Sequence, residues 1–157
     1  MDREVERKRA LSRAYNLLAV RARSSDEMRR RLRRAGFAES AVDDAMAQLQ
    51  RQSLLDDRSF ALAWVHGRMQ SRPRGTRLLE RELREKGISS EDVAAAIADI
   101  DDDATALKLA AHRAAILKGL DRQTFIRRLS NYLLARGFSG QTVSRAVNSV
   151  LPEPDDF

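Results

Sequence analysis

Two successive aspartates, Asp56 and Asp57, are the residues of this sequence that most resemble a pair of catalytic carboxylates. Paired carboxylates can divide the roles of general acid and general base. These two, however, directly precede apolar residues at helical spacing, namely Phe60, Ala61, Trp64 and Val65. Asp is favoured at the N-cap and in the first turn of a helix, because its carboxylate accepts hydrogen bonds from unpaired backbone N–H groups. We therefore interpret the pair as a helix start, and Asp101–Asp103 in the same way.

His66 and His112 are the only histidines, and the chain has no cysteine. A zinc site needs three or four suitably placed nitrogen, sulfur or oxygen ligands, which two distant histidines do not provide. The sequence also lacks a phosphate-binding glycine loop, a dinucleotide fingerprint and a nucleophile elbow. It therefore predicts a protein that is not an enzyme, with no catalytic residue, no metal and no cofactor.

The composition is that of a charged, helical chain. Of 157 residues, 43% are hydrophobic, 33% are charged and only 5% are aromatic. Abundant Ala, Leu, Arg and Glu favour helices over strands. The formal net charge of +6 predicts an acidic partner such as nucleic acid or a nucleoprotein. A charged amino terminus, no membrane-length apolar run and no cysteine predict a cytoplasmic protein that does not bind membranes.

Apolar residues recur with a period of about 50 residues, which is typical of arrays of small structural units. Gly36, Gly87 and Gly137 define the register. The aligned apolar sets are Leu32, Leu83 and Leu133; Val42, Val93 and Val143; Met46, Ile97 and Val147; and Leu49, Ile100 and Val150. So many coincidences indicate an internal repeat.

The aligned glycines predict the corner between the second and third helices of each repeat. Helices often end in a left-handed residue, where Gly is favoured, and the next apolar residue packs back onto the last turn. The packing pairs would be Phe37 with Leu32, Ile88 with Leu83, and Phe138 with Leu133. The R-P-R-G segment (72–75) is interpreted as a turn between helices, because Pro73 breaks the preceding helix.

The first helix of each repeat is predicted from helical spacing alone. In the first repeat it would cover about residues 5–22 and face inward through Leu11, Tyr15, Leu18 and Ala22, with Ala14 and Leu17 beside them. In the third repeat the inward residues would be Leu107, Ala111 and Ala114. Ser24 with Glu27 is a capping-box signature, which predicts the start of a second helix.

These patterns predict an all-α fold of three tandem three-helix repeats, with about nine helices in an elongated or curved array. The repeats would span residues 1–51, 52–100 and 101–151, and residues 152–157 would form a frayed tail. One repeat is too small to bury its apolar face well, so neighbours should share a core. A monomer is expected.

Basic and acidic residues are separated by their position in the repeat. The first two helices are mainly basic, and the third is acidic or neutral. The densest part, R-R-R-L-R-R at 29–34, sets like charges at i,i+4, where they repel by about 0.2–0.5 kcal/mol. Either the oxyanions of a partner offset that repulsion, or the segment is a solvated arginine-rich face. The predicted contact residues are Arg29, Arg30, Arg33, Arg34, Arg72, Arg74, Arg77, Arg81 and Arg84.

Several segments together resemble the RecX family of bacterial regulatory proteins. They are L-D-D-R-S-F-A-L-A-W-V (55–65), R-P-R-G (72–75) and L-x-x-E-L-R-E-K-G-I (79–88) in the central repeat, and Y-x-L-L (15–18), R-x-R-S-x-x-E-M-R-x-x-L (21–32) and G-F (36–37) in the first. The resemblance covers residues 10–150 and is weaker in the third repeat.

The resemblance implies a cytoplasmic modulator of the RecA recombinase. RecX-like proteins are helical repeats that lie in the groove of the RecA–DNA filament and suppress ATP hydrolysis and strand exchange, by blocking filament growth or promoting disassembly. The implied partners are the RecA filament and, weakly and non-specifically, single- or double-stranded DNA. The alternative is a basic helical-repeat protein that binds nucleic acid without RecA. Acidic residues such as Glu39 and Asp43 disfavour sequence-specific reading of DNA by the third helices.

Overall fold

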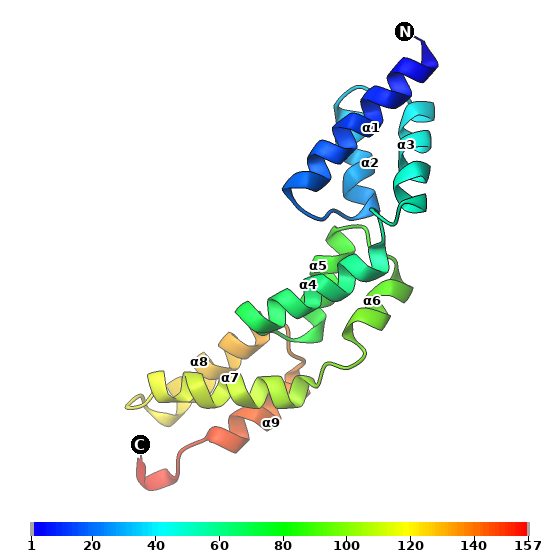
Figure 1. The fold of residues 1–157 in the computed structure, drawn as a ribbon. Helices are drawn as coiled ribbons and strands as arrows, with labels where there is room; N and C mark the ends of the chain where they lie inside the picture. Colours follow the sequence, from blue (N-terminus) through cyan, green and yellow to red (C-terminus); the bar gives the residue numbers. More distant parts are fainter. Residues whose placement is uncertain (1, 157) are drawn as a thin grey trace. The chain divides into compact units, whose positions relative to one another are not determined.

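The computed structural model describes residues 2–156, which fold into nine α-helices and one short 3-10 helix. The helices are α1 (Arg3–Val20), α2 (Ser25–Arg34), α3 (Glu39–Arg51), α4 (Asp57–Ser71), α5 (Thr76–Glu85), α6 (Ser90–Ile97), α7 (Asp102–Ile116), α8 (Arg122–Ala135) and α9 (Gly140–Val150), followed by the 3-10 helix Pro154–Asp156. This confirms the all-α fold of three tandem three-helix repeats, α1–α3, α4–α6 and α7–α9 (Figure 1). No helix in the described part of the chain combines the length and apolarity that crossing a membrane requires.

The described residues form two compact units, and the border between them runs through the second repeat. The first unit extends to Trp64 and also includes Leu83–Ala96. The second unit comprises Val65–Glu82 and the chain from Ile97 onward. Helices α4, α5 and α6 therefore each contribute residues to both units, so the second repeat divides its packing between them.

In the first repeat, α1, α2 and α3 lie against one another (Figure 1). Their core contains Met28 and Leu32 of α2 together with Val42, Met46 and Leu49 of α3. The helical spacing of the sequence placed these same residues inward. The predicted inner faces of the second and third helices are therefore confirmed in this repeat.

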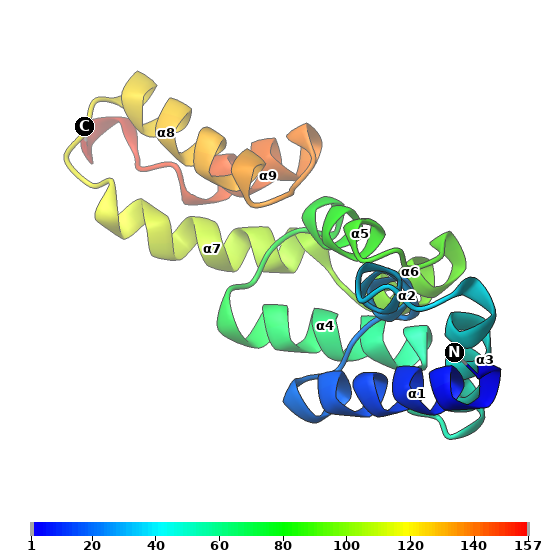
Figure 2. The ribbon, with the colours of Figure 1, turned by 90° about the horizontal axis from the view of Figure 1, so that it is seen from above.

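In the third repeat, α7, α8 and α9 enclose a separate core (Figure 2). Phe125, Leu129 and Leu133 of α8 are buried there with Val143 and Val147 of α9. The spacing that defines the inner faces of α2 and α3 therefore holds again in α8 and α9.

The first helix of the first repeat packs through part of the predicted face, and the predicted Leu11 and Leu18 lie partly buried against the core. Its buried residues are Ala10, Ala14 and Leu17. Tyr15 is 39% exposed, and Ala22 is exposed beyond the end of the helix. The prediction that these two residues face inward was wrong, because it weighted the size of the side chain rather than the helical face that contains the alanines.

The first helix of the third repeat shows the same departure. Ala106 and Ala110 are fully buried, whereas Leu107 is 44% exposed and Ala111 is exposed. The predicted inward positions of Leu107 and Ala111 were therefore wrong. A small side chain permits close approach of two helices, and α7 packs extensively on α9.

The corners after the second helices have the predicted backbone. Gly36, Gly87 and Gly137 adopt φ of +90°, +76° and +91°, in the left-handed region that favours glycine. At the third corner, the N–H of Phe138 donates a hydrogen bond to the carbonyl oxygen of Leu133 at 3.4 Å, the bond that closes this type of helix end.

The C-terminal segment after α9 includes the 3-10 helix Pro154–Asp156. Met1 and Phe157 lie outside the described residues. The frayed tail at 152–157 and the repeat boundaries at 51 and 100 therefore stay predictions.

Candidate functional site

The first aspartate of each Asp–Asp pair caps its own helix. Asp56 accepts hydrogen bonds from the N–H and the hydroxyl of Ser59, at 3.1 and 3.0 Å, at the start of α4. These bonds, the backbone one foremost, hold the pKa of Asp56 below its usual value. Asp101 accepts a hydrogen bond from the N–H of Ala104 at 3.1 Å at the start of α7. A carboxyl that donates protons near neutral pH needs a raised pKa, so Asp56 is a helix cap and not a catalytic acid. The hydrogen bond to Asp101 gives it the same capping role, as interpreted from the sequence.

The second aspartate of each pair caps a helix of the preceding repeat. Asp57 accepts a hydrogen bond from the N–H of Ser25 at 2.8 Å, at the start of α2. Asp102 accepts hydrogen bonds from the N–H and the hydroxyl of Thr76, at 3.0 and 2.6 Å, at the start of α5. The sequence assigned both aspartates only to their own helices, because nothing in a linear pattern indicates so distant a donor. Helices α2 and α5 are thus each anchored to the first helix of the next repeat.

The N-termini of α2 and α5 also contact the C-terminus of the second helix of the next repeat. The buried hydroxyl of Ser24 accepts a hydrogen bond from the N–H of Glu27 at 3.2 Å, which confirms the predicted cap, and it donates one to the carbonyl oxygen of Lys86 at 2.6 Å. In the second unit the N–H of Gly75 donates to the carbonyl oxygen of Arg136 at 2.8 Å. At each junction the negative end of one helix meets the positive end of another, which is the favourable sense for helix dipoles.

A charged cleft of about 230 Å³ lies at the junction in the first unit. Its lining residues are Asp26, Glu27, Arg30, Arg31, Arg34, Glu85 and Lys86. Arg30 pairs with Asp26 at 2.8 Å, yet its side chain is 63% exposed. Arg31 and Arg34 are exposed, and neither forms an ion pair with another residue of the described chain. The cleft therefore presents two guanidinium groups, those of Arg31 and Arg34, that form no ion pair among residues 2–156.

Glu27 is the structural carboxylate of this region. It accepts hydrogen bonds from Arg21 and from Arg23, the latter at 3.1 Å. Burial raises the pKa of Glu27, but the hydrogen bond from Arg21 and the charges of Arg21, Lys86 and Arg23 outweigh it, so the pKa lies below its usual value. Arg23 is itself buried and donates to the carbonyl oxygen of Leu17 at 3.2 Å. Glu27 therefore fixes the entry into α2.

Arg29 and Arg33, on another side of α2, are bound to α3. The distance from Arg29 Nη1 to Asp43 Oδ1 is 2.6 Å, and that from Arg33 Nη2 to Glu39 Oε2 is 3.0 Å. The hydrogen bond from Arg33 lowers the pKa of Glu39. These two predicted contact residues are thus engaged within the repeat, whereas the other two predicted on α2 line the charged cleft.

The remaining predicted contact residues fall into both compact units. Arg84 is exposed and belongs to the first unit. The exposed members in the second unit are Arg72, Arg77 and Arg81. The side chain of Arg74 is only 11% exposed, because its Nη1 pairs with Glu82 at 2.7 Å, a carboxylate that Arg68 also contacts at 2.9 Å. Arg74 is therefore a structural part of the turn before α5.

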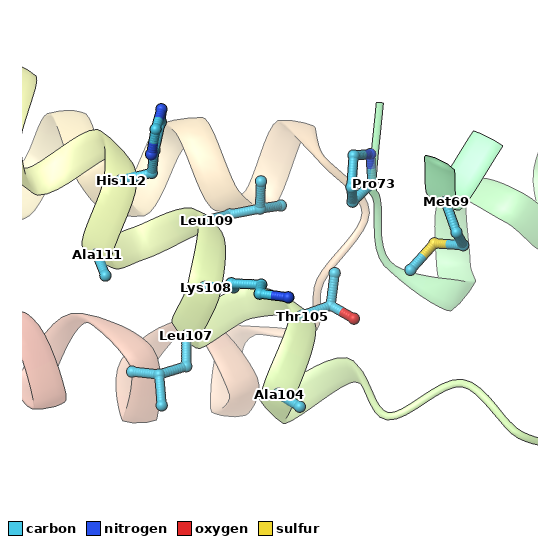
Figure 3. A pocket seen from close by; sticks show the side chains of 9 residues that line it. All are labelled: Met69, Pro73, Ala104, Thr105, Leu107, Lys108, Leu109, Ala111 and His112. Atoms are coloured by element: carbon cyan, nitrogen blue, oxygen red, sulfur yellow. The ribbon is translucent and has the colours of Figure 1, made fainter. Parts of the chain in front are cut away.

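An apolar groove of about 740 Å³ lies in the second unit, along α7 (Figure 3). Met69 and Pro73 line one part of it, and Leu107, Leu109 and His112 of α7 line another. No acidic side chain is among the lining residues. The sequence did not indicate this groove, because helical spacing placed Leu107 in the core.

The two histidines considered for metal binding and the single tryptophan have ordinary surroundings. His66 and His112 are exposed, and within residues 2–156 no three His, Cys, Asp or Glu side chains are grouped to hold a metal ion. Trp64 is half-buried, with its ring centroid 6.1 Å from that of Phe60 and with Lys86 Nζ 5.2 Å from the ring. Trp64 therefore packs within the first unit.

Comparison with protein-family models matches all three repeats. Residues 10–49 match the first three-helix domain of RecX, residues 56–97 the second, and residues 101–147 the third. Together the matches cover most of the chain.

Individual relatives agree with the family match. The regulatory protein RecX of Prosthecochloris aestuarii is 33% identical over 144 residues, which are 92% of this chain and 95% of the relative. RecX of Amycolatopsis mediterranei is 36% identical over 134 residues, 83% of this chain and 77% of the relative. The crystal structure of RecX from Lactobacillus salivarius has the same fold, with a TM-score of 0.85 at 19% identity over 94% of this chain and 97% of that one. The chain therefore belongs to the RecX family of regulatory proteins, and it is a regulator rather than an enzyme.

Proposed function

We propose that this protein regulates the RecA recombinase by binding the RecA–DNA filament, where it inhibits ATP hydrolysis and strand exchange. The match of all three RecX domains, between residues 10 and 147, is the observation that carries the proposal. Inhibition requires no chemistry, because a bound protein can block filament growth or promote disassembly. The protein would act in the cytoplasm and as a monomer.

The charged cleft of the first unit supports this proposal. Arg31 and Arg34 lack a carboxylate partner in the described chain, and Arg30 is largely exposed. Arg30 and Arg34 are four residues apart on α2, a spacing at which like charges repel. Phosphates of DNA or carboxylates of RecA would replace that repulsion by charge-assisted hydrogen bonds. Arg31 and Lys86 join the contact residues on this basis, although the sequence did not single them out.

The other predicted arginines divide between direct and indirect roles. Exposed Arg72, Arg77 and Arg81 form a second set of contacts, in the second unit. Arg74 holds the turn before α5 through Glu82 and contributes indirectly. Contacts of these kinds would also bind bare DNA weakly and without sequence preference, because they recognise phosphates rather than bases.

The test is the ATPase activity of RecA on single-stranded DNA, measured as this protein is titrated in. Inhibition well below one protein per RecA indicates capping of filament ends, and inhibition only near saturation indicates coating of the groove. Either result supports the proposal. An unchanged ATPase rate and unchanged strand exchange across the whole titration would overturn it.

A further inference from the structure

One position of the repeat carries a negatively charged carboxylate in the second repeat and an uncharged aromatic ring in the third. Arg68 is the twelfth residue of α4, and Arg113 is the twelfth residue of α7. Glu82 of α5 directly precedes one of the aligned leucines, and Tyr132 of α8 directly precedes another. In the second repeat the carboxylate of Glu82 pairs with Arg68 at 2.9 Å. The third repeat keeps the arginine but has a tyrosine where that carboxylate would be.

Tyr132 brings two arginines together without neutralising them. The Cζ atom of Arg113 lies 4.8 Å from the centroid of its ring, and that of Arg136 lies 5.1 Å from it. Neither guanidinium forms an ion pair within the described chain. The Nε atom of Arg113 is buried and has no hydrogen-bond partner. A buried donor without a partner is unfavourable. Arg136 differs in this respect, because its Nη1 donates a hydrogen bond to the carbonyl oxygen of Pro73 at 3.4 Å.

The cluster is continued by a further basic residue on the same face of α8. Arg128 precedes Tyr132 by four residues, and Arg136 follows it by four, so the three side chains lie on one side of the helix. Arg128 is exposed and forms no ion pair among the described residues. Arg128 and Arg136 are about 12 Å apart along the helix axis, and Arg113 lies at the Tyr132 ring between them.

We propose that Arg113, Tyr132 and Arg136, with Arg128 beside them, form a binding site for the phosphodiester backbone of a nucleic acid strand. Planar guanidinium groups bind phosphate oxygens through paired hydrogen bonds, and the Tyr132 ring holds two of them in place by cation–π contact. Three guanidinium groups that form no ion pair among residues 2–156 favour a polyanion over a single carboxylate. The site lies outside the predicted contact residues and needs no RecA for binding.

The test uses the full chain and a fluorescein-labelled oligothymidylate, with binding measured by fluorescence anisotropy at several salt concentrations. Tyr132→Glu places in the third repeat the carboxylate that the second repeat already has. It should weaken binding about tenfold. It should also reduce the salt dependence by about 1.4 in log–log slope, since two phosphate contacts are lost from a single strand. Tyr132→Phe, which keeps the ring, should bind like the original protein.

The matched control is Asn131→Glu, which adds the same charge at the adjacent, exposed position of α8. It should change affinity by less than about twofold, because it leaves the guanidinium pair intact. Equal losses in the two Glu variants, or no loss in Tyr132→Glu, would overturn the proposal. Equal competition by oligoglutamate would overturn it in favour of an acidic protein partner. If circular dichroism shows that Tyr132→Glu is unfolded, Arg136→Gln provides the test instead: it removes one guanidinium and should weaken binding and reduce the log–log slope by about 0.7.

Discussion

The carboxylate of Asp102, at the start of α7, accepts hydrogen bonds from both the N–H and the hydroxyl of Thr76, at the start of α5. Asp57 and Ser25 form the equivalent contact one repeat earlier, through the N–H of Ser25 at 2.8 Å. A residue 26 positions away in the sequence thus supplies a cap that α5 does not supply itself. The same contact occurs in both compact units, so it is a recurring feature of the way in which successive repeats are joined.

Asp102→Ala should therefore destabilise the protein by about 1–2 kcal/mol, the usual effect of losing a capping carboxylate. The measurement is urea unfolding followed by circular dichroism. Asp103→Ala is the control, because Asp103 forms only an exposed ion pair with Arg145 at 3.4 Å. Its effect should stay within about 0.5 kcal/mol. Similar losses in the two variants would show that the contact with Thr76 contributes no stability.

Substitution of the aligned glycines by alanine should give unequal effects. Gly36 and Gly137 have nearly the same φ, but a Cβ at Gly36 would meet no atom within 4 Å, whereas one at Gly137 would lie 2.4 Å from Cβ of Leu78. Gly36→Ala should lose about 1 kcal/mol through backbone strain alone. Gly137→Ala adds a steric clash and should lose at least about 1 kcal/mol more. Thermal unfolding of both variants checks this, and equal losses would contradict the close approach at the second junction.

Acid should weaken the first unit through Glu27. Its pKa is lower in the folded protein than its ordinary value of 4.5. A lowered folded pKa contributes stability above the ordinary pKa, and this contribution is lost as the pH falls through the folded value. Glu27→Gln should thus lower the free energy of unfolding at pH 7. It should also make that free energy fall less steeply as the pH is lowered. Urea midpoints from pH 7 to pH 3 test this, with Glu153→Gln, at an exposed position, as the control. If the urea midpoint of Glu27→Gln falls with pH as steeply as that of the original protein, this prediction is contradicted.

Reversal of charge in the cleft should weaken inhibition of RecA. The double variant Arg30→Glu and Arg34→Glu should raise the concentration for half-inhibition of the RecA ATPase about tenfold, which corresponds to about 1.4 kcal/mol of binding free energy. Reversal of Lys8 and Arg13, which are exposed on α1, makes the same change in net charge and should have little effect. Unchanged inhibition by a folded cleft variant would remove these arginines from the interface.

Much of the fold was predictable because each repeat contains the same spacing of apolar residues and the same aligned glycine. Leu32, Leu83 and Leu133 are fully buried, and each is followed by a glycine corner with positive φ. Large apolar residues at helical spacing and a glycine at a fixed offset are local signals, and three copies of each make chance agreement improbable. The second and third helices, with their inner faces, follow from these signals.

The first helices and the contact residues were harder to predict, for two physical reasons. Ala10 and Ala106 are buried where helices pack closely, and the small size of alanine gives no sign of which face turns inward. Arg74 appeared available for contact because its partner Glu82 lies on another element. Whether an arginine is neutralised depends on tertiary neighbours, which a linear sequence does not display.

The division of α5 between the two compact units bears on any attempt to shorten or shuffle this protein. Leu79 is buried in the second unit, and Leu83, one turn later on the same helix, is buried in the first. A truncation that removes α5 therefore withdraws a buried leucine from each of the two units. We therefore expect that the repeats, although alike in pattern, cannot be excised or grafted independently, because the residues of α5 are divided between the two units.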